Sequence, residues 1–141
     1  MADTVTVLPV LPGDRGLERE FINLPHRIYA GDPHWVPRFR REMRRMIRRR
    51  HPFFDHTDAQ YLVAQRNGYT VARLLVVVNR RYNEHHNRGD AHFYYFDAFD
   101  DASAVDAAFA AAVEWARDQG CTGMAGPMLS GGASGHGILV D

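Results

Sequence analysis

The stretch from Ala91 to Gly120 constrains the fold most strongly, because it predicts a strand that passes directly into a long helix. Its first part, His92 to Phe99, is rich in aromatic residues, which favour a pleated, half-buried strand. In its second part apolar residues recur at helical spacing up to Gly120, which is expected to form a left-handed cap. The recurring residues are Val105, Phe109, Ala112, Val113 and Ala116. We therefore predict a strand, a short turn and a helix.

The turn between these two elements is the first place to look for a ligand. A helix N-terminus offers free N–H groups and the positive end of a dipole, which together suit a pyrophosphate. The residues present are acidic, however, and Asp97, Asp100 and Asp101 would repel phosphate. As helix caps, Asp100, Asp101 and Ser103 need no further function.

The rest of the chain predicts a mixed α/β fold. The predicted elements are a strand at 4–10, helices at 14–29 and 38–49, strands at 61–65 and 70–78, and a last strand at 121–129. Pro25 predicts a kink or a break into two short helices, and Asn67-Gly68 predicts a tight hairpin. The strand at 70–78 is almost entirely apolar, so we place it at the centre of an antiparallel meander. We expect 80–90 to be a polar loop.

Charge is unevenly distributed along a chain whose net charge is zero. The 17 basic residues are all arginines; they concentrate in 38–50, whereas 97–118 is acidic. Opposed patches favour docking between parts of one fold, or an anionic ligand, over uniform nucleic-acid binding. The helix at 38–49 has two interpretations: a surface helix whose arginine stems cover apolar surface, or an anion-binding face. Its expected apolar face is Phe39, Met43, Met46 and Ile47.

Several classes of function find no support in the sequence. No apolar run approaches the roughly 20 residues needed to cross a bilayer, and the N-terminus lacks signal-peptide features, so we expect a cytoplasmic protein without a membrane partner. The histidine clusters lack metal-ligand spacing, and we expect ordinary surface histidines instead of a metal site. The glycine-rich segment 130–137 lacks the lysine and the following helix of a phosphate-binding loop, so we interpret it as a connector.

Five blocks of sequence, together with this order of elements, carry a resemblance to a known family. They are FINLPHRIYAGDPHWVPRFR at 21–40, HPFFDHTDA at 51–59, NRRYNEHH at 79–86, FYYFDAFDD at 93–101, and GPM followed by GILVD near the end. The chain resembles the first part of the GNAT N-acetyltransferase fold. It is most similar to a group of longer, sparsely characterised bacterial GNAT-like proteins.

The resemblance implies a GNAT-like α/β fold, with a mixed, mostly antiparallel sheet flanked by helices. The last helix and strands of the usual fold are not found in the sequence. On this basis residues 1–141 form a single GNAT-like domain, or an incomplete N-terminal half of a longer protein.

The activity that the resemblance implies is acetyl transfer from acetyl-CoA to an unidentified amine. Asp97 is the candidate general base, acting directly or through a water, and backbone N–H groups of the strand would polarise the thioester carbonyl. The candidate cofactor contacts are Phe96, Ala98, Phe99 and Ser103. GNAT enzymes carry [Q/R]-x-x-G-x-[G/A] at this turn, whereas FDAFDDASA has three acids and no glycine.

Two other hypotheses remain open. The first is a non-catalytic GNAT-like module that associates with another domain, or forms a homo-oligomer, through an exposed sheet edge. The second is a nucleic-acid contact through the arginine helix, although aromatic residues for stacking on bases are absent from that face.

Overall fold

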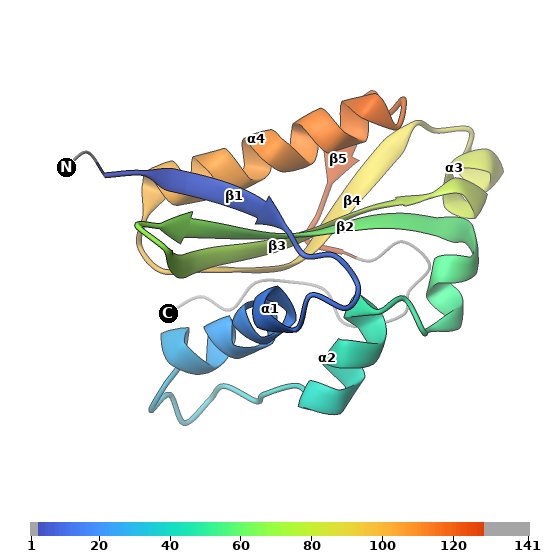
Figure 1. The fold of residues 1–141 in the computed structure, drawn as a ribbon. Coiled ribbons are helices and arrows are strands. Elements are labelled where there is room, and N and C mark those ends of the chain that lie inside the picture. Colours follow the sequence, from blue (N-terminus) through green and yellow to red (C-terminus); the bar gives the residue numbers. More distant parts are fainter. Residues whose placement is uncertain (1–2, 129–141) are drawn as a thin grey trace.

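The computed structural model describes residues 3–128, and within them five strands form one sheet in the order β1-β2-β3-β4-β5 (Figure 1). The elements in chain order are β1 (Val5–Pro9), α1 (Arg15–Ile28), α2 (Arg40–Ile47), the 3-10 helix η1 (Pro52–His56), β2 (Thr57–Arg66), β3 (Tyr69–Asn79), α3 (Arg80–His86), β4 (Asp90–Ala98), α4 (Ala102–Asp118) and β5 (Gly123–Ala125). The predicted connector at 130–137 lies outside the described residues.

The sheet is mixed and mostly antiparallel, which confirms the predicted fold class. β1 to β4 pair antiparallel in succession, and β5 runs parallel to β4. The hairpin at Asn67-Gly68 is also confirmed, because both residues have the positive φ angles that such tight turns require. No helix between residues 3 and 128 is long and apolar enough to span a membrane.

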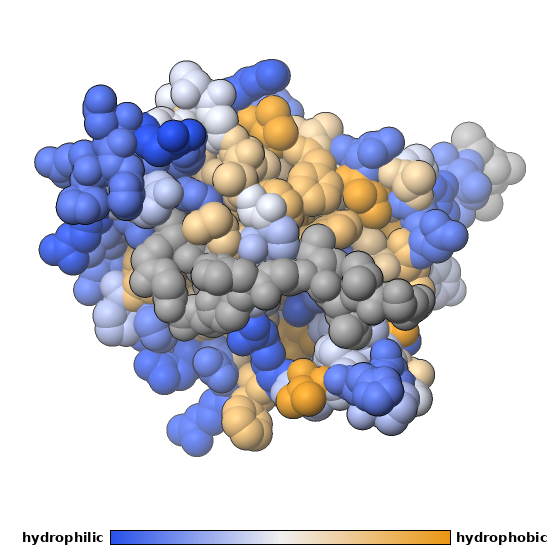
Figure 2. All heavy atoms as spheres, turned by 180° about the vertical axis from the view of Figure 1, so that it is seen from behind, coloured by the Kyte–Doolittle hydropathy of each residue, from blue (hydrophilic) through white to orange (hydrophobic). Residues whose placement is uncertain are grey.

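Helices cover both faces of the sheet, and β3 lies between them as predicted. Leu75 and Val77 of β3 pack with residues of α1 and α2, whereas Leu74 and Val76 pack on the side of α4. The two layers lie on opposite sides of the sheet in Figure 1. Seen from behind, apolar side chains gather beside α4 (Figure 2), where α4, β4 and β5 contribute half-buried Phe93, Phe96, Phe109 and Met124.

The buried face of α4 is a stripe of small residues. The buried side chains are Ala104, Ala108, Ala112 and Ala116, four residues apart. Of the predicted face only Ala112 and Ala116 are buried, while Val105, Phe109 and Val113 are half-buried. Alanine side chains let the helix lie close to the sheet, so the larger residues flank the contact.

Three local predictions are wrong. The break into two helices at Pro25 is not found, because α1 continues through this proline as one helix; a kink there stays a prediction. Residues 80–86 form α3 where we expected a loop, because the Asn79 side chain caps the helix by accepting from the Tyr82 N–H at 3.0 Å. Phe39 precedes α2 and its side chain is exposed, whereas Met43, Met46 and Ile47 are buried as predicted.

Gly126 allows the segment after β5 to lie against β4. The Met128 N–H donates to the Phe93 carbonyl at 2.9 Å, and a Cβ on Gly126 would lie 2.6 Å from that same oxygen. No real Cβ tolerates such a contact with backbone, so a side chain at this position must push the two segments apart.

We expect Gly126→Ala to lower the free energy of unfolding by about 1–3 kcal/mol, the usual cost of overpacking. Gly16→Ala is the matched control, because that glycine lies in the first turn of α1 with room for a methyl group. It should raise stability by up to about 1 kcal/mol, since alanine is the better helix former. Urea denaturation measures both variants, and equal stability of Gly126→Ala and the unchanged protein would contradict the packing described here.

Candidate functional site

The middle of β4 contains a β-bulge. Arg73 pairs with Asp97 and Leu75 with Tyr94, so a single residue of β3 lies opposite two residues of β4. Tyr95, inside the bulge, has a φ of +50°, which is rare for an aromatic residue. Bulges of this kind redirect side chains and leave one residue outside the regular ladder, and they are frequent next to functional sites.

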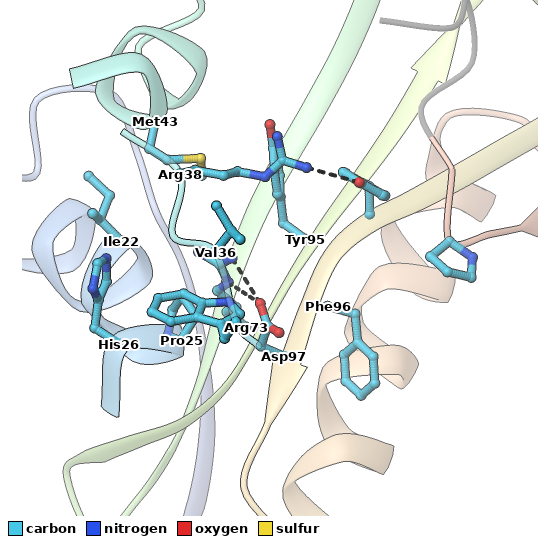
Figure 3. Close-up of a pocket in the computed structure, with 13 residues that line it drawn as sticks. Ile22, Pro25, His26, Val36, Arg38, Met43, Arg73, Tyr95, Phe96 and Asp97 are labelled. Carbon is cyan, nitrogen blue, oxygen red and sulfur yellow. Dashed lines mark hydrogen bonds and ion pairs between the residues drawn. The ribbon is translucent and has the colours of Figure 1, made fainter. Parts of the chain in front are cut away.

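A cavity of about 240 Å³ lies beside the bulge, between α1, the linker at 29–39 and β4 (Figure 3). Pro25 and His26 line it from α1. The linker and β4 supply most of the remaining wall, namely Trp35, Val36, Arg38, Tyr94, Tyr95, Phe96 and Asp97. The wall is therefore largely aromatic and apolar, with a few charged groups, which is the usual composition of a small-molecule site.

Asp97 is held by two donors at the cavity wall. Its Oδ2 accepts from Nε and Nη2 of Arg73 at 2.9 and 2.8 Å, and its Oδ1 accepts from the Tyr29 hydroxyl at 2.8 Å. Figure 3 shows the Arg73 and Asp97 side chains converging behind Val36 and Pro25. Both carboxylate oxygens are thus engaged within the protein.

Arg73 extends this network to α1. Its Nη1 donates to the Phe21 carbonyl at 2.9 Å, which is the carbonyl that Pro25 leaves without a helical partner. The Arg73 side chain is only 6% exposed. Burial lowers the pKa of this guanidinium, and the adjacent Asp97 carboxylate opposes that shift.

His26 and Arg38 also line the cavity. Burial, together with the nearby charges of Arg40 and Arg73, lowers the pKa of His26, so the neutral imidazole prevails at pH 7. Its ring packs edge-on against the Trp35 ring, with 5.0 Å between the ring centroids. Arg38 donates to the Tyr94 hydroxyl at 3.0 Å and lies over the Tyr95 ring, which ties the linker to β4.

The predicted site residues fall into two groups. Asp97 and Phe96 line the cavity. Ala98 pairs with Ala72 inside the sheet, and the Phe99 N–H donates to the Val71 carbonyl. Ser103 lies at the start of α4, where it accepts a hydrogen bond from Arg66. Ala98, Phe99 and Ser103 are therefore separate from the cavity lining.

The N-terminus of α4 already faces a carboxylate. Asp101 accepts from the Ala104 N–H at 3.1 Å, and it binds the Arg66 guanidinium through Nε at 2.7 Å and Nη2 at 2.8 Å. The hydrogen bonds from Arg66 hold the pKa of Asp101 well below its usual range. The position that would favour a phosphate is thus occupied by the Asp101 carboxylate, together with the Arg66 guanidinium that binds it.

Sequence reasoning did not identify His26, Tyr29, Trp35, Arg38 and Arg73 as site residues. One signal could have indicated Arg73, since an arginine inside the apolar strand VARLLVVV needs a buried partner. Asp97, the last residue but one of β4, supplies that partner. Among residues 3–128 no three His, Cys, Asp or Glu side chains converge to hold a metal.

Comparison with solved structures identifies the fold. A tandem GNAT protein from the clavulanic acid biosynthesis pathway matches with a TM-score of 0.68 and 17% identity, covering 94% of this chain and 40% of that one. An aminoglycoside acetyltransferase from an uncultured soil metagenomic sample, in complex with sisomicin, matches with a TM-score of 0.62 and 10% identity, covering 92% and 80%. The chain therefore has the GNAT acetyltransferase fold, as its sequence blocks predicted.

Two curated proteins are similar in sequence. The chain is 34% identical over 123 residues to bacterial ceramide synthase of Caulobacter vibrioides, and 29% identical over 123 residues to Protein YghO of Escherichia coli. These alignments cover 85% and 87% of this chain but 32% of each relative, so the chain spans about a third of their length. No family model matches the chain.

We expect Arg73→Met to lower the free energy of unfolding by about 3–5 kcal/mol, the usual cost of breaking a buried ion pair by removing one partner. The variant leaves the Phe21 carbonyl without the Arg73 donor and the Asp97 carboxylate without its cation. Arg88→Met is the control, because the Arg88 side chain is 60% exposed in its pair with Asp90 and its removal should leave the free energy of unfolding almost unchanged. Urea denaturation measures both variants. A similar loss of unfolding free energy in Arg73→Met and Arg88→Met would contradict the structural role of Arg73.

Proposed function

We propose that the protein is an N-acyltransferase that moves an acyl group from a thioester to an amine. The observation that carries this proposal is the bulge of β4 beside the cavity. Within the described residues, β4 pairs with β5 only from Asp90 to His92, so the bulged segment borders a part of β4 that β5 does not cover. A backbone N–H outside the ladder and an adjacent cavity are what a thioester carbonyl needs.

The proposed reaction is a direct transfer. The amine nitrogen attacks the carbonyl carbon while the carbonyl oxygen accepts a hydrogen bond from the bulged backbone. The C–S bond then breaks, an amide forms, and the sulfur leaves as a thiolate. The proton released by the amine passes to a base in the cavity and finally to the thiolate, so atoms and charge balance.

We assign different roles to Asp97 and His26: Asp97 positions groups, and His26 accepts the proton. Both oxygens of Asp97 accept hydrogen bonds from Arg73 and Tyr29, so direct proton transfer to it would disrupt that network. We assign Asp97 the role of fixing the cavity wall and orienting a water. His26 lines the same cavity as a neutral imidazole, which is the form a general base requires.

The proposed acyl donor is an acyl-CoA. The cavity suits its thioester end, whereas the turn before α4 does not suit its diphosphate. Phe96 lines the cavity and is the proposed contact to the thioester end. The turn before α4 does not fit the diphosphate, because Asp101 and Arg66 already satisfy each other there. We therefore assign no step to the diphosphate.

The proposed acceptor is the amine of an amphiphilic molecule. One curated relative is called a ceramide synthase, and a ceramide is the amide of a fatty acid and a long-chain amine. The aromatic and apolar wall formed by Trp35, Val36, Tyr94 and Phe96 supports an acceptor with an apolar part.

Incubation with palmitoyl-CoA and sphinganine tests the function directly. Mass spectrometry should detect the amide, and thiol release should match it in amount. Tyr69→Ser, on the exposed hairpin and away from the cavity, is expected to keep full activity. Failure to form an amide from palmitoyl-CoA or acetyl-CoA, with no thermal shift at millimolar concentrations of either, would reject the enzyme hypothesis.

The proton acceptor can be tested through the pH dependence of kcat. The neutral imidazole of His26 is the active form, so activity should rise with pH through its pKa, which is lowered and therefore falls below about 6.5. His26→Gln should reduce kcat by about 10²- to 10⁴-fold and abolish this acidic limb. Asp97→Asn should reduce kcat and keep the limb. If His26→Gln retains the limb, another group accepts the proton.

A second candidate function is a non-catalytic association module, and the acidic turn before α4 favours it. A folded chain that binds neither palmitoyl-CoA nor acetyl-CoA, but sediments as a dimer, would support this alternative. Thioester binding by a monomer would count against it.

A further inference from the structure

The segment 38–50 combines strong positive charge with an unusual exposure of apolar residues. It contains eight arginines and one glutamate. Met43, Met46 and Ile47 face the core, so helical geometry places Arg41 and Arg45 on the opposite, outward side of α2. Within residues 3–128, Arg41 and Arg45 form no ion pair. Their charges are therefore available to an external anion.

Two large apolar side chains immediately before α2 are exposed to solvent. Val36 is 83% exposed and Phe39 is 81% exposed. The linker that carries them is attached to β4 near both ends, because the Tyr29 hydroxyl donates to Asp97 and Arg38 donates to the Tyr94 hydroxyl. The exposed apolar side chains thus stand on a segment that the rest of the fold holds in place.

We propose that this basic and apolar face, made of Val36, Phe39 and the outward arginines of α2, docks on the surface of an anionic lipid bilayer. A polar helix rich in arginine beside protruding apolar side chains matches the chemistry of an interface between headgroups and acyl chains. Each arginine near such a surface contributes roughly a fivefold gain in binding. Anionic lipid also accounts for the exposure of Val36 beside the charge, because this aliphatic side chain has no ring that could stack on a base.

A neighbouring groove adds to the same face. It lies between α1 and α2 and is lined by Arg15, Arg19, Arg40, Arg44 and Arg48. Glu18 also lines it, but both Glu18 oxygens are bound by Arg48 at 3.0 Å. The remaining arginines leave the groove positively charged, which suits the phosphate of a lipid headgroup.

The position of this face relates it to the cavity. Val36 and Arg38 both line the cavity, as Figure 3 shows, and they belong to the same linker as Phe39. An amphiphilic acceptor could pass from the bilayer to the cavity along this linker, and that step alone rests on the proposed function. The docking itself does not, and it is an alternative to our expectation from the sequence that the protein has no membrane partner.

Vesicle flotation tests the docking with the full chain. The protein should float with vesicles of phosphatidylcholine containing about 30% phosphatidylglycerol, and it should not float with phosphatidylcholine alone. Arg41→Gln with Arg45→Gln should weaken binding about 30-fold, roughly fivefold for each arginine. Phe39→Ser should weaken it about tenfold or more, because the ring loses its burial among acyl chains.

Matched variants elsewhere on the surface provide the controls. Tyr69→Ser removes an aromatic ring of similar exposure, 74%, from the β2–β3 hairpin, and Arg81→Gln with Arg117→Gln removes two charges from α3 and α4. Both controls should bind vesicles as the unchanged protein does. The proposal is overturned if the protein does not float, if it floats equally with neutral vesicles, or if the controls lose as much binding as the test variants. Circular dichroism confirms that each variant is folded.

Discussion

The buried guanidinium of Arg73 is the interaction on which the site depends. Removing an arginine from water is costly, so its donors must all be satisfied inside the protein. They are satisfied by the Asp97 carboxylate in β4 and by the Phe21 carbonyl in α1, and the guanidinium also lies 4.8 Å from the centre of the Phe21 ring. One side chain of the central strand thereby fixes the helix that lines the cavity relative to the bulged strand.

The linker at 29–39 forms part of the wall of the cavity and is attached to β4. Tyr29 at its start binds Asp97, and Arg38 near its end binds Tyr94, so both ends of the linker are attached to the bulged part of β4. The cavity, the proposed base His26 and the exposed residues Val36 and Phe39 all follow from this attachment. The GNAT fold here carries a bulge in β4, which is the proposed thioester site, while Asp101 and Arg66 bind each other at the turn before α4.

Much of the fold could be predicted from the sequence, because it depends on local patterns. The hairpin at Asn67-Gly68, the apolar run of β3 and the sequence from β4 to α4 each have a clear periodicity or turn signal. The predicted break at Pro25 was wrong because the freed Phe21 carbonyl finds a donor in Arg73, 48 positions further along the chain than Pro25. The site was only partly predictable for the same reason. Asp97 was identified from the family pattern, whereas the positions of His26 and Arg38 depend on tertiary packing.

In the proposed reaction, the bulged segment of β4 receives a thioester carbonyl. Titration of ¹⁵N-labelled protein with acetyl-CoA, followed by the shifts of its backbone amides, tests this claim most directly. The largest shifts should occur at Tyr95, Phe96 and Asp97, because a new hydrogen bond to the carbonyl changes the amide environment there. Shifts confined to the start of α4, or no shifts at millimolar ligand, would contradict the claim.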